Sequence, residues 1–283
     1  MRVLIIGSGG REHALAWSVF GSPLCDELLV APGNPGIADM IEGRGRCIPV
    51  SLTDLDSLVE LARSEACDLV IIGPEAPLVD GLADKFGAAA IPVCGPSAAA
   101  AQLEGSKYFA RAFCARHMIA QPHWQYFTEI EPAKRFARTL GSCVVKADGL
   151  AAGKGVVICD NAEQAEHAIL SLLGGRFGAA SAEILVEERI SGPEISAFAL
   201  LDGPEAVWLG SAQDHKRAFD GDKGPNTGGM GAISPSPFET DELHASIMDD
   251  IILPVARGMA DEGMPYRGIL YAGLMLTETG PQI

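Results

Sequence analysis

Short apolar runs alternate with amphipathic segments along the first hundred residues. The apolar runs have the length of buried strands and are expected at 3–6, 28–31, 47–50, 68–73 and 91–95. Helices are expected between them at 11–20, 54–65 and 78–89. In the second of these, Leu55, Leu58, Val59 and Ala62 recur at i, i+3, i+4 and i+7 and form one apolar face. Strands that alternate with helices predict a doubly wound parallel sheet, here an α/β domain over residues 1–103.

The rhythm changes after Glu104. Helices are expected at 106–117, 132–140 and 162–173, and strands at 124–127, 143–147, 156–159, 184–188, 195–201, 206–210 and 269–277. Runs of strands with few intervening helices are typical of antiparallel sheets. Residues 104–283 are therefore expected to form a second, α+β domain. The three tryptophans, Trp17, Trp124 and Trp208, are expected to be packing residues.

Composition narrows the range of partners. The chain has 283 residues and a formal net charge of −16, with 33 Gly and 18 Pro that follow no period. An acidic surface repels phosphate backbones, so nucleic acid is not expected as a partner. Small anionic substrates would instead be held by backbone N–H groups and a few well-placed cations.

Cysteine usage and hydropathy indicate the compartment. The seven cysteines are dispersed and odd in number, and none form a C-x-x-C pair, which favours reduced thiols. The first apolar run ends at Gly7, too short for a signal peptide, and no run approaches the roughly 20 residues of a membrane helix. A cytoplasmic protein without a membrane partner is expected.

A glycine turn, residues 7–10, stands between the first strand and the first helix. Glycine N–H groups and a helix N-terminus together attract anions. Dinucleotide sites have Gly at the sixth position of G-x-G-x-x-G, where this chain has Glu12. They also have a carboxylate after the second strand, where this chain has Ala31-Pro32-Gly33. A phosphate-bearing small molecule is favoured. A dinucleotide and a purely structural turn remain as alternatives.

Other strand ends carry similar loops. Residues 32–36, 73–75 and 95–97 each follow an expected strand and combine Gly with Pro. Ligands of open α/β sheets bind at the carboxyl ends of the strands. Glu75 could therefore bind sugar hydroxyls, or it could be a solvated loop carboxylate.

A second constellation fits a nucleotide. Lys146 ends an apolar strand, and residues 148–155 form a loop of small residues that contains Lys154. This loop is no Walker A motif, because Gly155 follows Lys154 and the loop joins two strands. Glu187 ends a later strand and Glu194 opens the next, which suits an adenine and a ribose. Each feature alone is a weak signal.

The whole chain resembles the phosphoribosylamine–glycine ligase family of ATP-grasp enzymes. Matching motifs stand in order at residues 7–17, 73–78, 103–107, 145–155, 213–217, 224–231 and 270–275. Several long motifs in sequence are far more specific than one glycine-rich loop.

The resemblance implies an ATP-grasp fold behind an amino-terminal domain that binds 5-phosphoribosylamine. The implied reaction joins glycine to that amine, via glycyl phosphate, and yields glycinamide ribonucleotide, ADP and phosphate. The implied cofactors are ATP and Mg²⁺ or Mn²⁺, and the partners are small molecules. The chain is expected to be a monomer or weak homodimer.

The resemblance also implies roles for individual residues. The residues expected to act on the phosphates and on glycine are Lys146, Lys154, Asp214 and Lys216. The nucleotide is expected to contact Lys107, Lys146, Gly153, Lys154, Glu187, Glu188, Ile190 and Glu194. The other substrates are expected to contact Gly9, Gly10, Arg11, Gly36, Glu75, Asp214, Asn226, Thr227 and Gly228. Asp214 would bind the glycine ammonium, although a solvated charge run is the alternative for 214–217.

No metal ligand is assigned within the chain. The strand at 269–277 is followed by a hairpin turn, and the metal ligands of the family are expected beyond Ile283. This chain alone is therefore expected to lack effective ligase activity. Three alternatives remain: another ATP-grasp ligase or carboxylase, a nucleotide-binding module without catalysis, and a dinucleotide oxidoreductase.

Overall fold

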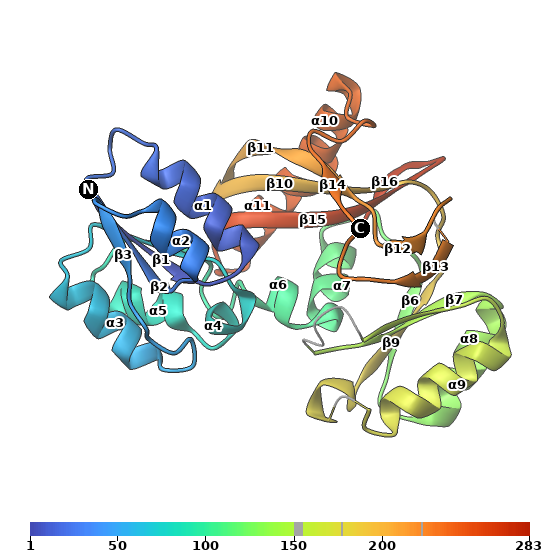
Figure 1. Ribbon diagram of the computed structural model, residues 1–283. Helices are drawn as coiled ribbons and strands as arrows, with labels where there is room; N and C mark the ends of the chain where they lie inside the picture. Colours follow the sequence, from blue (N-terminus) through green and yellow to red (C-terminus); the bar gives the residue numbers. More distant parts are fainter. Residues whose placement is uncertain (150–154, 177, 222) are drawn as a thin grey trace. The chain divides into compact units, whose positions relative to one another are not determined.

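The computed structural model describes residues 1–149, 155–176, 178–221 and 223–283 (Figure 1). The chain divides into two compact units. The first comprises residues 1–101 together with 264–269, and the second comprises 102–263 together with 270–283. Each unit is described by itself.

The first unit is built on a five-stranded parallel sheet of order β3-β2-β1-β4-β5. Its strands are β1 (Arg2–Gly7), β2 (Glu27–Pro32), β3 (Gly45–Cys47), β4 (Leu69–Ile72) and β5 (Val93–Cys94). Its helices are α1 (Gly10–Phe20), α2 (Pro35–Met40), α3 (Leu55–Ser64), α4 (Glu75–Val79) and α5 (Leu82–Ala88). The predicted parallel sheet is confirmed, and its order changes direction between β1 and β4.

Alternate residues of β1 supply two separate cores. Leu4 and Ile6 pack with side chains of α3 and α5, whereas Val3 and Ile5 pack with side chains of α1 and α2. A strand that is apolar on both faces must be covered on both. The unit is therefore doubly wound, as its sequence pattern predicts.

Four elements of this unit differ from the expectation. The helix α2 was not expected, and β5 covers Val93–Cys94 instead of 91–95. The helix expected over 78–89 is two helices, because Gly81 lies between α4 and α5 with φ of +85°, a left-handed conformation that interrupts a helix. The third strand covers Gly45–Cys47 instead of 47–50.

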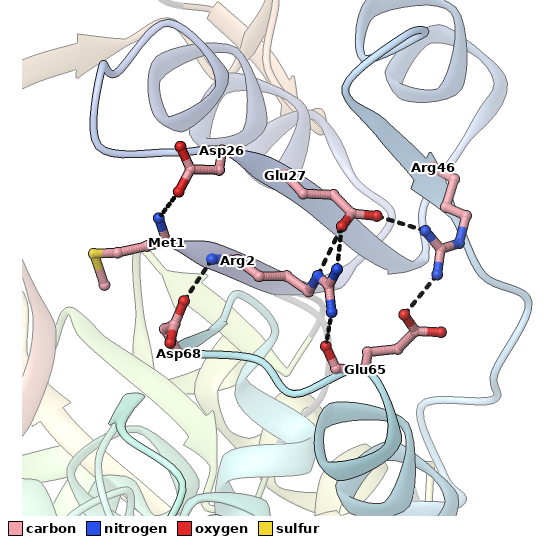
Figure 2. A network of polar contacts seen from close by, with 7 residues as sticks. All are labelled: Met1, Arg2, Asp26, Glu27, Arg46, Glu65 and Asp68. Atoms are coloured by element: carbon pink, nitrogen blue, oxygen red, sulfur yellow. Dashed lines mark hydrogen bonds and ion pairs between the residues drawn. The ribbon is translucent and has the colours of Figure 1, made fainter.

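A polar network fastens the amino-terminal edge of this sheet (Figure 2). Arg2 Nε and Arg46 Nη1 donate to the two oxygens of Glu27 at 2.7 and 2.6 Å. Arg46 also binds the Glu65 carboxylate, and Arg2 donates to the Glu65 carbonyl. Burial raises the pKa of Glu27, but the two arginines outweigh it and the pKa is lowered. These contacts join β1, β2, β3 and the end of α3 away from the glycine turns.

The second unit begins with α6 (Gln102–Gly105) and α7 (Lys107–Arg116), followed by a four-stranded antiparallel sheet of order β6-β9-β7-β8. The strands are β6 (Trp124–Phe127), β7 (Cys143–Ala147), β8 (Val156–Cys159) and β9 (Ile184–Glu188). The helices α8 (Ile130–Leu140) and α9 (Ala162–Leu173) and the short 3₁₀ helix η1 (Gly178–Ser181) accompany it. Ala133, Ala137, Val145, Ile169 and Val186 belong to one core, so α8 and α9 cover one face of the sheet.

A second sheet has the order β14-β11-β10-β15-β16. Its strands are β10 (Glu194–Asp202), β11 (Glu205–Asp214), β14 (Ala232–Ile233), β15 (Arg267–Thr277) and β16 (Gly280–Gln282). A hairpin of β12 (Arg217–Phe219) and β13 (Lys223–Asn226) lies between β11 and β14 in the sequence. The α+β character of this part is confirmed, and β15 and β16 form the expected hairpin.

The helical stretch over 241–261 was not predicted. It runs through α10 (Asp241–Ile247), the π-helical turn η2 (Met248–Ile252) and α11 (Leu253–Asp261). Its π turn shifts the apolar face out of the ordinary 3.6-residue period. In the sequence alone, Pro254 also indicates the end of a helix. Within the described residues, no helix is long and apolar enough to span a membrane.

The tryptophan prediction is partly wrong. Trp124 contacts the Tyr108 ring and Trp208 contacts the His244 ring, with centroids 6.0 and 4.6 Å apart. Trp17, however, is 71% exposed on α1. Leu15 and Ala16, its neighbours on α1, pack into the hydrophobic core of the first unit instead.

Candidate active site

The glycine turn after β1 leads directly into α1. Gly9 is the N-cap of α1, and Gly10 and Arg11 form its first turn. The Gly9 N–H donates to Glu12 Oε2 at 2.7 Å, and Arg11 Nε donates to Glu12 Oε1 at 2.6 Å. The Arg11 side chain is 54% exposed, and its Nη2 lies 3.6 Å from Glu75 Oε2. The turn thus presents a helix N-terminus and an oriented guanidinium, the components of a phosphate site.

Loops from two further strand ends adjoin this turn. Asn34, after β2, donates from Nδ2 to the Ser8 carbonyl at 2.9 Å and caps α2 through the Ile37 N–H. Gly36 lies in α2, where a Cβ would come 2.9 Å from the His13 ring of α1. Glu75 is the first residue of α4, after β4. The predicted residues of this unit therefore gather at the carboxyl ends of β1, β2 and β4.

The four-stranded sheet of the second unit has a face opposite α8 and α9, here called the Lys146 face. The strand registers place these side chains on it: Trp124, Tyr126, Val144, Lys146, Val156, Ile158, Leu185 and Glu187. Val156 and Ile158 are each 41% exposed. The Lys146 face thus combines apolar surface with one cation and one carboxylate.

Glu187 holds two cations of this unit together. It is 2% exposed and accepts from Arg111 Nε and Nη2, both at 2.9 Å, while Lys146 Nζ lies 2.6 Å from its Oε2. Burial raises the pKa of Glu187, but Lys146 and Arg111 outweigh it and lower that pKa. Burial lowers the pKa of Lys146, and Glu187 opposes that effect. The three side chains carry one net positive charge, which suits a phosphate.

Lys107 stands at the first position of α7, beside the stem of the glycine loop. Its Nζ donates to the carbonyls of Asp148 and Gly149 at 3.3 and 3.2 Å. The Asp148 carboxylate in turn accepts from the Ser106 hydroxyl and from the Tyr108 N–H at 2.7 Å. Burial lowers the pKa of Lys107, against the charge of Asp148. Asp148 therefore ties the loop stem to the N-terminus of α7.

Two predicted nucleotide contacts, Gly153 and Lys154, lie outside the described residues. Glu188 ends β9 with an exposed side chain, and its N–H donates to the His123 carbonyl at 2.7 Å. Ile190 is half-buried in the segment that joins β9 to β10. Neither residue contacts Lys146 through its side chain in the hydrogen bonds and ion pairs of the described chain.

Glu194, Asp214 and Lys216 form a separate group where β10 begins and β11 ends. Lys216 Nζ lies 3.0 Å from Glu194 Oε2 and 3.6 Å from Asp214 Oδ1. Burial lowers the pKa of Lys216, but the two carboxylates outweigh it and raise that pKa. A cation between two carboxylates can exchange partners with a ligand that carries both charges.

The loop after β13 is fastened to this group. The Thr227 N–H and hydroxyl both donate to the Lys216 carbonyl, at 2.7 and 2.9 Å, and the Gly229 N–H donates to Thr227 Oγ1. The backbone of Asn226 pairs with Arg217, and Gly228 lies within the turn. The predicted loop residues thus adjoin Lys216.

No metal centre can be built from the residues that the structure describes. Among them, no three His, Cys, Asp or Glu side chains gather as ligands. The described donor set does not by itself fit a divalent ion.

Sequence reasoning missed Glu12, Arg111 and Asp148 as members of these sites. Arg111 is one turn along α7 from Lys107, and its neighbours Phe113 and Cys114 are buried. A charged residue on the buried side of an amphipathic helix is an available signal for a buried partner. The sequence holds no signal for the identity of that partner, Glu187, which is 76 residues away.

The fold is that of an ATP-grasp protein, and an ATP-grasp domain model matches residues 105–283. A structure of similar fold is the biotin carboxylase domain of the Hydrogenobacter thermophilus 2-oxoglutarate carboxylase, solved in complex with MgADP, ADP and bicarbonate. It is 19% identical with a TM-score of 0.72, and covers 99% of this chain and 62% of that one.

The chain belongs to the phosphoribosylglycinamide synthetase family. Residues 1–104 match the family's "Phosphoribosylglycinamide synthetase, N domain", and residues 105–283 match its "ATP-grasp (A) domain". The phosphoribosylamine–glycine ligase of Thermotoga maritima has a TM-score of 0.83 at 31% identity, and the match covers 100% of this chain and 67% of that one.

Curated relatives agree with this assignment. The phosphoribosylamine–glycine ligase of Caulobacter vibrioides is 52% identical over 284 residues, and the match covers 100% of this chain and 66% of that protein. The ligase of Escherichia coli O6:H1 is 50% identical over 282 residues, which cover 99% of this chain and 65% of that protein. The chain therefore spans about two thirds of the length of these relatives.

Proposed function

We propose that this chain provides the substrate- and nucleotide-binding parts of an ATP-dependent carbon–nitrogen ligase of purine biosynthesis. The ligase joins glycine to 5-phosphoribosylamine and releases ADP and phosphate. The observation that carries the proposal is the Arg111–Glu187–Lys146 group on the Lys146 face, in a chain that belongs to the phosphoribosylglycinamide synthetase family. A buried group with one net positive charge is suited to the phosphates of a nucleotide.

The adenine would lie on the apolar part of the Lys146 face. Val144, Val156 and Ile158 share this face with Lys146 through the register of β7 and β8. Aliphatic side chains that are exposed together fit a flat, uncharged base. The segment 188–190, which begins at the last residue of β9, supplies backbone polar groups for the edge of the base. Glu194, at the start of β10, would bind the ribose hydroxyls.

The phosphates would contact Lys146 and Lys107, and also Lys154 of the glycine loop. Among the described residues, the hydrogen bonds of Lys107 Nζ go to two backbone carbonyls, at 3.3 and 3.2 Å, and charged phosphate oxygens are stronger acceptors than these. An oxygen of the glycine carboxylate attacks the γ-phosphorus, and ADP leaves. The amine of phosphoribosylamine then attacks the acyl carbon, phosphate leaves, and the amine loses one proton. Both steps depend mainly on positioning and on charge neutralisation.

Glycine is assigned to Asp214 and Lys216, next to Glu194. Asp214 would bind its ammonium, and Lys216 the developing charge on the acyl phosphate. Thr227 and Gly228 supply the loop beside Lys216. The phosphate of phosphoribosylamine is assigned to the first unit, to Gly9, Gly10 and Arg11, with Gly36 and Glu75 near the ribose.

Calorimetric titration of the chain with ADP and with ribose 5-phosphate tests the proposal. Ribose 5-phosphate is a stable analogue that carries a hydroxyl in place of the amine. Saturable binding of both ligands, at one site each, is the expected result. NADH serves as the control and should not bind.

Two other outcomes separate the alternatives. Binding of ADP without ribose 5-phosphate would assign the chain to a different ATP-grasp reaction. The absence of ADP binding would contradict the nucleotide site. A panel of acceptor amines and acids in a phosphate-release assay then identifies the reaction partners.

A further inference from the structure

Glu12 is a buried carboxylate that the proposed reaction does not use. It is 3% exposed, in the first turn of α1, although it has the position at which a dinucleotide site would have glycine. Burying a charged carboxylate is costly unless it is paired and hydrogen-bonded. Glu12 meets this condition through Gly9 N–H at 2.7 Å and Arg11 Nε at 2.6 Å.

Two glycines from different strand ends make room for this carboxylate. A Cβ at Gly7, which ends β1, would lie 2.6 Å from Glu12 Cδ, and so would a Cβ at Gly73, which follows β4. Contacts this short do not occur between real side chains. Gly7 also has φ of +130°, a conformation that favours glycine by itself, whereas at Gly73 the lack of space is the reason for glycine. The Glu12 side chain therefore fills the gap between β1 and β4, where the strand order of the sheet changes direction.

The hydrogen bonds of Glu12 leave the terminal nitrogens of the Arg11 guanidinium available to a ligand. The carboxylate binds the Nε of Arg11, and the contact of Nη2 with Glu75 is longer, at 3.6 Å. The same carboxylate occupies the Gly9 N–H, so the N–H groups of Gly10 and Arg11 are the next donors of the helix N-terminus. An anion at this turn would therefore meet two backbone amides and a guanidinium whose orientation is fixed by the Glu12 carboxylate.

We propose that Glu12 is a positioning residue for the phosphate of the amino-terminal unit. It orients Arg11 toward a single phosphate monoester. The inference deepens the proposed function, on which its choice of ligand rests. It assigns Glu12 no contact with the ligand itself.

The variant Gly73→Ala tests this mechanism because it moves the carboxylate without removing its charge. Its Cβ must displace Glu12, and with it Arg11, so the dissociation constant for ribose 5-phosphate should rise about 10-fold or more, as expected when a charge-assisted contact is lost. Glu12→Ala should weaken binding to a similar extent. In the double variant, the added methyl fits the space that Glu12 vacates, so its effect should not exceed that of Glu12→Ala alone.

Controls separate positioning from general damage. Gly87→Ala, in α5, places a Cβ with no atom within 4 Å and should change nothing. The affinity for ADP should be the same in all variants, and melting temperatures identify any variant that fails to fold. Glu12→Asp, which keeps the charge but shortens the reach, should show a partial loss.

Three outcomes would overturn the inference. One is tighter binding of ribose 5-phosphate by Glu12→Ala, which would mean that the carboxylate merely repels the anion. Another is a double variant much weaker than Glu12→Ala, which would mean that Gly73 acts on the ligand directly. The third is unchanged affinity in folded Gly73→Ala. If the unmodified chain does not bind ribose 5-phosphate at all, the proposed substrate falls as well, and that result is distinguishable from the other three.

Discussion

Lys146 illustrates how one residue's chemistry depends on neighbours distant in the sequence. Its strand position is visible in the sequence, but its partner Glu187 comes from β9 and the second cation, Arg111, from α7. Each of these three charges would be costly to bury without the other two. The group therefore has to be considered as a unit in any substitution.

The first prediction concerns Lys146→Met. Loss of the charged contact to nucleotide phosphates should cost about 1.5–3 kcal/mol, or roughly a 10- to 150-fold rise in the dissociation constant for ADP. Titration calorimetry provides the measurement. Lys134→Met, on α8 and paired with Glu131 and Glu166, is the matched control and should keep the original affinity. An equal loss in both variants would contradict the role of Lys146.

A second prediction concerns pH. The charged groups that act on Lys146 are Glu187 of β9, which raises its pKa, and Arg111 and Lys107 of α7, which lower it. In Glu187→Gln the two lowering charges and burial remain, so the pKa of Lys146 falls further. Only the ammonium form attracts phosphate. ADP affinity in this variant should therefore begin to fall at a lower pH than in the unmodified chain.

Titrations of ADP at closely spaced pH values check this shift. The control is Glu163→Gln, which removes an exposed carboxylate from the first turn of α9. If ADP affinity begins to fall at the same pH in Glu187→Gln and in the unmodified chain, Glu187 does not set the charge of Lys146.

The third prediction separates ribose from phosphate recognition at Glu194. Glu194→Ala should weaken ATP more than inorganic triphosphate, because only ATP has ribose hydroxyls. The ion pair with Lys216 is lost in both measurements, so it cancels from the comparison. Competition titrations against ADP give the two affinities, and equal weakening would rule out a ribose contact.

At the scale of elements, one carboxylate joins the ends of two helices in the second unit. Glu262, the C-cap of α11, accepts from Arg116 Nε and Nη2 at 2.9 and 2.8 Å and lies 2.8 Å from His117 Nε2. Arg116 and His117 end α7. The hydrogen bond from Arg116 is the largest influence on Glu262, and together with His117 it lowers the pKa of this carboxyl from 4.5 to about 2.

A fourth prediction follows from this pair of helices. A carboxylate with a lowered pKa stabilises the fold above its unfolded value, and the contribution is lost as the pH falls from 4.5 toward about 2. Glu262→Gln should therefore lower stability at pH 7, and the difference should shrink below pH 4.5. Urea unfolding across this range measures it. Glu60→Gln, in an exposed pair with Arg63, should change little at any pH.

Turns and caps explain which elements were predictable. Asp54, Ser106, Asn161 and Thr240 cap α3, α7, α9 and α10 through their side chains, and the first three helices were predicted near these caps. The fourth was missed although its cap is present, because the π turn that follows breaks the apolar period. Local signals therefore sufficed where the geometry was regular.

At the scale of the whole molecule, the proposed ligands fall in different units. The residues assigned to the phosphosugar, from Gly9 to Glu75, all lie in the first unit. The nucleotide residues Lys107, Lys146 and Glu194 lie in the second. A ligand that binds only the folded state raises stability in proportion to the logarithm of its concentration over its dissociation constant.

The fifth prediction uses this division. ADP and ribose 5-phosphate should each raise the melting temperature, and ADP should protect residues of the second unit from hydrogen exchange while ribose 5-phosphate protects the first. Mass spectrometry of exchanged peptides gives the map. At an ADP concentration that just saturates the unmodified chain, Lys146→Met should weaken only the ADP pattern. Protection of the second unit by ribose 5-phosphate in that variant would contradict the assignment of the two sites.

The sequence by itself determined the alternation of strands and helices, the parallel sheet of the first unit and the order of the family's motifs. These features depend on local periodicity, glycine turns and caps, which a chain carries in neighbouring residues. Only the tertiary structure decided that Glu12 lies between Gly7 and Gly73, that Glu187 joins Arg111 to Lys146, and that Asp148 fastens a loop to α7. Buried charges choose partners by their position in space, and sequence separations of 40 to 76 residues hold no periodic signal for that choice.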